Sequence, residues 1–160
     1  MGRTSKGKVM ERVVLDTNIL LQIIPSKSNF HYIWEKILDG DIVVCISTEI
    51  LYEYEEILSQ RIPHDIVLQI LYNIENHPKT IKVSNYVRWN VVEADADDNK
   101  YVDCAVAAGA KILVSDDKHL RVLKKKVPPL VDLKTLQEYH QYLNAKKQSG
   151  IRPSKRPPRK

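Results

Sequence analysis

The sequence predicts an α/β fold in which a parallel β-sheet is covered on both faces by helices. Short, continuously apolar runs alternate along the chain with longer segments in which apolar residues recur every three or four positions. Strands that alternate with helices need crossover connections, and these favour parallel pairing. The length of 160 residues fits one domain with its own core.

The strands are expected where apolar runs are short and continuous. They are the segments 12–16 (RVVLD), 41–47 (DIVVCIS), 80–84 (TIKVS), 111–117 (KILVSDD) and 128–132 (PPLVD). The first, second and fourth have uninterrupted apolar residues, which indicates burial on both faces of the sheet. The third is weaker, and an irregular connection at 85–95 follows it.

The helices are expected where apolar residues recur at helical spacing between stop signals. They are the segments 17–24, 30–40, 49–61, 63–76, 97–109, 119–126 and 133–143. Pro25 ends the first of these helices, and Gly109 ends the fifth. Ser47 or Thr48 caps the third, and Pro63 opens the fourth.

Charge is distributed unevenly along the chain, whose formal net charge is +5. Three bases lie in residues 1–10 and seven in residues 145–160, and neither segment contains an acid. Residues 11–144 therefore hold 15 bases against 20 acids, a net charge of −5. An acidic body suits a site built from carboxylates, and basic ends suit a polyanion such as RNA. We expect a domain over 11–144 with disordered basic extensions at both ends.

The composition argues against membrane and secreted proteins. No apolar run approaches the roughly 20 residues that span a bilayer. The first twelve residues lack the apolar stretch of a secretory signal. We therefore expect a soluble, cytoplasmic protein. Cys45 lies in a predicted buried strand and Cys104 in an alanine-rich helix, so both are expected to be buried thiols.

Acids stand directly after two of the predicted strands. Asp16 ends the first strand, and Asp116 and Asp117 end the fourth. The carboxyl ends of parallel strands share one edge of the sheet, which is where such folds bind ligands. Asn18, two residues after the first acid, is placed to orient Asp16 or to bind a water molecule. We expect these side chains to lie along one edge.

Two further acids lie toward the apolar faces of predicted helices. Glu53 borders the apolar stripe of helix 49–61. In helix 97–109, Asp98 aligns with the apolar positions of the buried face. Asp103 is about 140° away from Asp98 on the same helix and is expected to face solvent. An inward acid needs a cation or strong donors as partners, because burying an unpaired carboxylate is expensive.

Taken together, four acids from four separate segments predict a metal site. They are Asp16, Glu53, Asp98 and Asp117. Clusters of oxygen ligands without His or Cys suit hard cations such as Mg²⁺ or Mn²⁺. Four carboxylates cannot all stay ionised close together unless positive charge lies between them. We expect one or two divalent ions to supply that charge.

The ordered set of segments that carries these acids resembles the PIN-domain family, particularly the bacterial PIN proteins that are toxins of toxin–antitoxin systems. The segments are VVLDTNIL, ISTEILYEYEEIL, DADDNKYVDCAVAAGAKILVSDDKHL and PPLVDLKTLQEY, which span most of residues 12–140. The resemblance implies a three-layer α/β PIN fold with a central parallel sheet, and a metal-dependent ribonuclease that leaves a 5′-phosphate and a 3′-hydroxyl. It also implies RNA as substrate, a small antitoxin as partner and, as is common among related proteins, a homodimer.

The resemblance also assigns roles to individual positions. It makes Mg²⁺ or Mn²⁺ ligands of the four acids, which are Asp16, Glu53, Asp98 and Asp117. Asn18 and Ser115 become supporting polar groups. Asp116 stands where Gly or Asn is common in the family, so the choice between it and its neighbour stays open. Asp97 and Asp103 remain alternatives to the third acid.

Three rival functions compete with this interpretation. A phosphatase of the haloacid-dehalogenase type needs a second Asp two residues after the first, where this chain has Asn18. A nucleotide-binding protein would need a glycine-rich loop, but the five glycines are isolated. The third rival is a catalytically silent PIN module that binds RNA or a protein. The presence of all four acids argues against silence, and RNA cleavage with and without Mg²⁺ separates these two functions.

Overall fold

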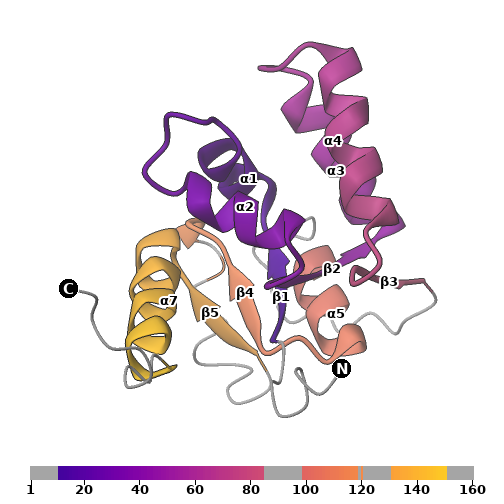
Figure 1. Cartoon of the computed structure of the whole chain (residues 1–160). Helices are drawn as coiled ribbons and strands as arrows, with labels where there is room; N and C mark the ends of the chain where they lie inside the picture. Colours follow the sequence, from indigo (N-terminus) through magenta and orange to yellow (C-terminus); the bar gives the residue numbers. More distant parts are fainter. Residues whose placement is uncertain (1–10, 85–98, 119, 121–130, 151–160) are drawn as a thin grey trace.

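The structure is a computed structural model that describes residues 11–84, 99–118, 120 and 131–150 (Figure 1). Within these residues, five strands pair in parallel in the order β3-β2-β1-β4-β5. They are β1 (Arg12–Leu15), β2 (Val43–Ser47), β3 (Ile81–Val83), β4 (Ile112–Val114) and β5 (Asp132–Lys134). The predicted parallel α/β sheet is confirmed.

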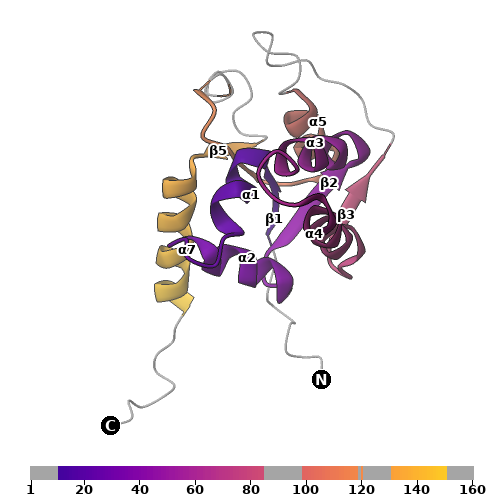
Figure 2. The same cartoon turned by 90° about the horizontal axis from the view of Figure 1, so that it is seen from above.

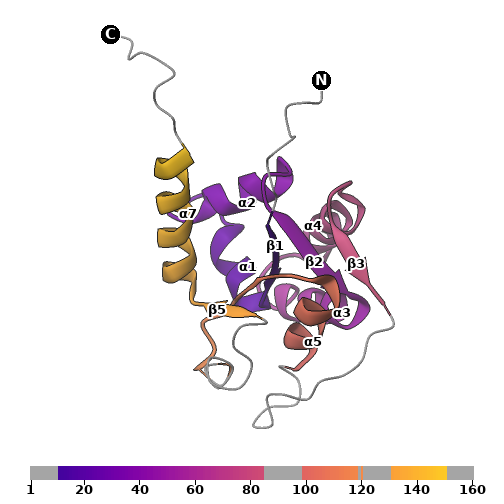
Figure 3. The same cartoon turned by 90° about the horizontal axis from the view of Figure 1, so that it is seen from below.

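Helices cover both faces of this sheet and form a three-layer fold. They are α1 (Thr17–Ile23), α2 (His31–Leu38), α3 (Thr48–Leu58), α4 (His64–Asn76), α5 (Asn99–Ala108) and α7 (Leu136–Gly150). In Figure 1, α1 to α4 lie above the sheet and α5 lies below it, in contact with the first four strands. The views from above and below show β1 near the centre of the sheet and α7 beside the edge strand β5 (Figures 2 and 3).

The pairing of the two central strands places the residues that follow them side by side. Leu15 of β1 is the partner of Val114 in β4. The ladder continues beyond this pair, because the backbone N–H of Asp16 donates to the carbonyl of Val114 at 3.0 Å. Asp16 and Ser115 are therefore neighbours at the carboxyl edge, as parallel strands in this register require.

Helix α3 is attached to the end of β1 by a buried tyrosine. Ser47 caps the helix by accepting a hydrogen bond from the N–H of Ile50 at 3.2 Å. The inward residues are spaced four apart along the helix, and among them Tyr54 is 0% exposed. Its hydroxyl donates to the carbonyl of Leu15 at 2.6 Å. This bond fixes α3 relative to the residue just before Asp16, and thereby positions Glu53.

The expectation that Asp103 faces solvent is wrong, because this residue is 0% exposed. The five successive residues from Tyr101 to Ala105 are all buried. Helix α5 touches β1, β2, β3, β4 and α3, so it is covered around most of its circumference. A helical wheel with one buried face does not apply to a helix that is enclosed on several sides. The predicted end at Gly109 is confirmed by its φ of +70°, which favours glycine.

The carboxyl-terminal elements begin and end later than expected. The last strand reaches Lys134, and Thr135 then caps α7 through a capping box with Glu138, whose N–H donates to the Thr135 hydroxyl at 3.1 Å. Helix α7 runs to Gly150, six residues past the domain end expected at 144. Lys146, expected in a disordered tail, lies on this helix with its ammonium 3.8 Å from Glu11.

Some predictions lie outside the described residues. They concern the irregular connection at 85–95, nearly all of the helix at 119–126, and the disorder of residues 1–10 and 151–160. None of the helices in the described ranges combines the length and apolarity that a membrane span requires.

Candidate active site

Asp16 is the centre of the candidate site. It follows β1 and is 6% exposed, although it is a carboxylic acid. The hydroxyl of Ser115, at the end of the neighbouring strand, donates to its Oδ2 at 2.7 Å. The same hydroxyl oxygen accepts a hydrogen bond from the backbone N–H of Asp117 at 3.0 Å. Ser115 therefore connects the acids that follow β1 and β4.

The surroundings of Asp16 make its negative charge unfavourable. Burial is the main cause that raises the pKa of Asp16 above its usual value. The negative charges of Glu53 and Asp117 raise this pKa further, while the hydrogen bond from Ser115 lowers it. Asp16 makes no capping hydrogen bond to α1, but the backbone N–H of Asn18 also lowers its pKa. A cation bound beside Asp16 would relieve this cost.

Glu53 approaches the site from α3 and is paired with a lysine. Its side chain is 27% exposed, which agrees with the position at the margin of the apolar stripe. The Nζ atom of Lys100, in the first turn of α5, lies 2.7 Å from Oε1 of Glu53. The structure thus joins α3 and α5 by an ion pair next to Asp16.

A second buried contact ties α5 to the start of α1. The hydroxyls of Thr17 and Tyr101 are 2.9 Å apart and share a hydrogen bond. Both residues are 1% exposed. Burial, followed by the negative charge of Asp16, raises the pKa of Tyr101, so this hydroxyl stays neutral at physiological pH. The contact holds the residue after Asp16 against the helix that carries Lys100.

Asp116 and Asn18 are directed differently from Asp16 and Ser115. Oδ1 of Asp116 accepts from the backbone N–H of Leu136 at 2.9 Å, and its Oδ2 accepts from the Gln22 side chain at 3.1 Å. Asp116 is exposed and connects α1 with the start of α7. Asn18 is also exposed. The negative charge of Asp117 is among the causes that raise the pKa of Asp16.

The structure therefore brings together part of the predicted set. Glu53 and Asp117 are each close enough to Asp16 to raise its pKa. Asp97 and Asp98 lie outside the described residues. Within the ranges that are described, no three His, Cys, Asp or Glu side chains are close enough to one another to hold one ion. The oxygen donors and the unfavourable charge of Asp16 fit a hard divalent cation in their chemistry.

Sequence reasoning missed Lys100, Tyr54 and Tyr101. Neither tyrosine hydroxyl had a predicted role, yet the hydroxyl of Tyr54 binds the end of β1 and that of Tyr101 binds the start of α1. A signal for Lys100 was present, because a cation in the first turn of a helix is opposed by the helix dipole. Such a residue needs a nearby acid, and Glu53 provides it.

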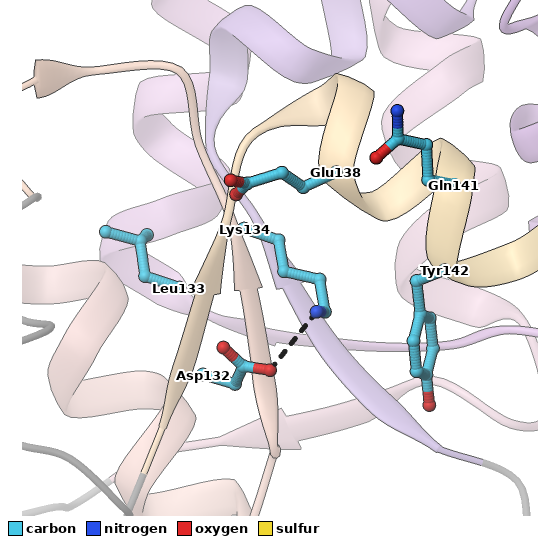
Figure 4. Close-up of a pocket in the computed structure, with 6 residues that line it drawn as sticks. All are labelled: Asp132, Leu133, Lys134, Glu138, Gln141 and Tyr142. Carbon is cyan, nitrogen blue, oxygen red and sulfur yellow. Dashed lines mark ion pairs between the residues drawn. The ribbon is translucent and has the colours of Figure 1, made fainter.

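A pocket elsewhere on the surface lies between β5 and α7 (Figure 4). It is lined by Asp132, Leu133, Lys134, Glu138, Gln141 and Tyr142. Lys134 pairs with Asp132 at 3.3 Å, and its ammonium lies 5.0 Å from the centre of the Tyr142 ring. None of the predicted site residues lines this pocket, so it is separate from the candidate active site.

This chain is a three-layer parallel α/β domain, and its interacting acids lie at the carboxyl edge of the central strands. Proteins of this class bind ligands at that edge of the sheet. A sequence profile of the PIN domain matches residues 12–119. The chain belongs to the PIN-domain family. The predicted family is therefore confirmed. PIN domains are nuclease-type domains and generally use divalent metal ions, so this chain is a PIN domain of nuclease type.

Solved structures are similar to this chain over most of its length. A chain in the crystal structure of VapBC2 from Rickettsia felis, bound to a DNA fragment from their promoter, matches with a TM-score of 0.52 and 17% identity over 78% of this chain and 98% of that chain. The T. brucei RRP44 PIN domain matches with a TM-score of 0.47 and 14% identity over 92% of this chain and 87% of that chain. No curated protein sequence matches significantly.

Proposed function

We propose that this protein is a metal-dependent endoribonuclease that hydrolyses phosphodiester bonds in RNA. The observation that carries the proposal is the state of Asp16, a buried acid held by Ser115 and destabilised by the charges of Glu53 and Asp117. A carboxylate in such surroundings gains most from a cation beside it. Membership in the PIN family supports a nuclease, and the acidic set supports Mg²⁺ or Mn²⁺ as the ion.

In this mechanism the ligands are Asp16, Glu53, Asp98 and Asp117. When bound, Mg²⁺ or Mn²⁺ would supply Lewis-acid chemistry that lowers the pKa of a water molecule and polarises the scissile phosphate. Ser115 holds the carboxylate of Asp16 in place and keeps the backbone of Asp117 beside it. Attack by water in line with the leaving oxygen leaves a 5′-phosphate and a 3′-hydroxyl. In the described part of the chain the histidines bond to Ile23, Tyr32, Glu55 and Leu38 and not to a proposed metal ligand, so none is placed as a separate base.

The proposal is tested with the purified full chain and a labelled single-stranded RNA. Cleavage is measured in Mg²⁺, in Mn²⁺ and in excess EDTA, for the wild type and for Asp16→Asn. Asp41→Asn is the matched control, because Asp41 is exposed and precedes β2 at the opposite end of the sheet. We expect cleavage only with metal, no cleavage by Asp16→Asn, and wild-type cleavage by Asp41→Asn.

Four results would contradict parts of this proposal. Full activity of Asp16→Asn, or of the wild type in excess EDTA, would refute the metal mechanism. RNA binding without cleavage in either metal would favour the catalytically silent PIN module. The end groups of the products are read by phosphatase and ligase treatment, and a 3′-phosphate would contradict the proposed direction of attack.

We further propose that the chain is the toxin of a toxin–antitoxin pair, with a small antitoxin as partner. The resemblance of its segments to such toxins and the fold shared with the VapBC2 chain support this proposal. Expression of the wild type alone should arrest growth, and Asp16→Asn should not. If a small protein is encoded beside this chain, its co-expression should restore growth and yield a complex. A homodimer is the proposed state of the toxin itself, and light scattering measures it.

A further inference from the structure

Lys100 is an unusual lysine, because its charge is paired with a candidate metal ligand and is largely enclosed. Its side chain is 14% exposed, whereas the ammonium group of a lysine normally reaches water. Nζ lies 2.7 Å from Oε1 of Glu53 and 5.6 Å from the centre of the Tyr101 ring. The ammonium group therefore lies over the ring of a buried tyrosine and beside a candidate metal ligand.

The position of Lys100 in its helix is unfavourable unless its charge is needed there. The first turn of α5 is the positive end of the helix dipole, which repels an ammonium group. The carboxylate of Glu53 offsets this repulsion. Glu53 in turn acts on Asp16, whose pKa it raises together with Asp117. Lys100 thus pairs with one of the two acids whose charges raise the pKa of Asp16.

We propose that Lys100 is a positioning residue that holds Glu53 and acts as the built-in counter-ion of the carboxylates before metal binds. Entry of a divalent cation and the Lys100–Glu53 ion pair then oppose each other, since both neutralise the same negative charge. This inference rests on the proposed metal-dependent function. It predicts that Lys100 weakens metal binding while it stabilises the metal-free protein.

The first test is titration of the full chain with Mn²⁺ by calorimetry, without RNA. Lys100→Met removes the charge and keeps a long apolar stem beside Tyr101. Lys82→Met is the matched control, because Lys82 also pairs with a glutamate, Glu75, at the surface near β3. We expect Lys100→Met to bind Mn²⁺ about three- to tenfold more tightly than the wild type, the size of effect that one nearby charge produces at a partly buried site. Lys82→Met and Lys100→Arg should bind like the wild type.

The second test separates this role from ordinary packing. In EDTA, Lys100→Met should melt at a lower temperature than the wild type, and saturating Mn²⁺ should remove most of the difference. A packing role would leave the same difference in both conditions. If Lys100→Met does not fold in EDTA, the proposal requires Mn²⁺ to restore its folding, and failure to do so overturns it.

The outcomes distinguish this inference from the function on which it rests. A wild type that binds Mn²⁺ and a Lys100→Met variant that binds it equally or more weakly would overturn the counter-ion role alone. A wild type that binds no Mn²⁺ would overturn the proposed metal-dependent function and this inference together.

Discussion

Removing the hydroxyl of Ser115 should reveal how much its hydrogen bonds at Asp16 and Asp117 contribute to the free energy of unfolding of the domain. Ser115→Ala deletes the donor to Oδ2 of Asp16 and the acceptor of the Asp117 N–H. Hydrogen bonds to a charged group contribute about 1.5–3 kcal/mol, and neutral ones about 0.5–1.5 kcal/mol. Asp16 is 6% exposed, so water does not replace the lost donor. We expect Ser115→Ala to lower the free energy of unfolding by about 2–4 kcal/mol.

A double-mutant cycle with Asp16→Asn isolates the charged part of this effect. The amide introduced by Asp16→Asn keeps an oxygen that accepts from Ser115, but this bond is between neutral groups. The loss at the Asp117 N–H occurs in both backgrounds and cancels. Ser115→Ala should therefore cost about 1–2 kcal/mol less in the Asp16→Asn background than in the wild type.

The assay is urea unfolding of the four proteins in EDTA at pH 7, followed by circular dichroism. Equal slopes with denaturant would show that the variants unfold from comparable native states. Distant, independent sites add within roughly 0.3–0.5 kcal/mol. A coupling energy below that limit would refute the view that Ser115 stabilises the charge of Asp16.

Further predictions concern the attachment of α3, the charge of Asp16 and the carboxyl-terminal residues. Tyr54→Phe should lower the free energy of unfolding in urea by about 1–3 kcal/mol, because the carbonyl of Leu15 loses its buried donor. As a control, Tyr52→Phe should change stability by less than about 0.5 kcal/mol, because this side chain is 68% exposed. In EDTA, ionised Asp16 should cost stability. Its folded pKa is raised above the ordinary value of 3.8, so this cost is absent at more acidic pH and grows as the pH rises through the folded pKa. Asp16→Asn should therefore be more stable than the wild type at pH 7. If the difference in stability between the two proteins is the same at pH 4 and pH 7, ionisation of Asp16 is not its cause. Deleting residues 151–160 removes five bases and should weaken RNA binding. The slope of the logarithm of the binding constant against the logarithm of the salt concentration should become less steep by up to about 3.5. An unchanged slope would exclude phosphate contacts by this segment.

The parts of the fold that follow from local patterns were predictable. Continuous apolar residues in β1 indicated burial on both faces, and Val13, Val14 and Leu15 are at most 1% exposed. The alternation of strands with helices indicated parallel pairing. Parallel pairing in turn placed Asp16 and Asp117 at one edge, since the carboxyl ends of such strands coincide. These inferences need only neighbouring residues and the geometry of the sheet.

The errors came from contacts between distant segments. The exposure of Asp103 depends on how many elements surround α5, which a helical wheel does not contain. The pair of Lys100 and Glu53 joins residues 47 positions apart, and the two elements meet only through the sheet order. Residues 145–147 are helical although they are exposed, and the distant contact of this stretch is the ion pair of Lys146 with Glu11. Composition alone predicted a solvated tail there.

In this site, buried hydrogen bonds lie on both sides of a carboxylate whose negative charge is unfavourable. Buried hydroxyls of Tyr54 and Tyr101 hold the residues immediately before and after Asp16, whereas the carboxylate itself is buried at a cost. Those two contacts attach β1 and α1 to α3 and α5, the helices that carry Glu53 and Lys100. Tightening this scaffold does not reduce the repulsion among the acids, because the charges remain the same distance apart. Only added positive charge does so, from Lys100 in the metal-free protein and, in the function we propose, from the divalent ion.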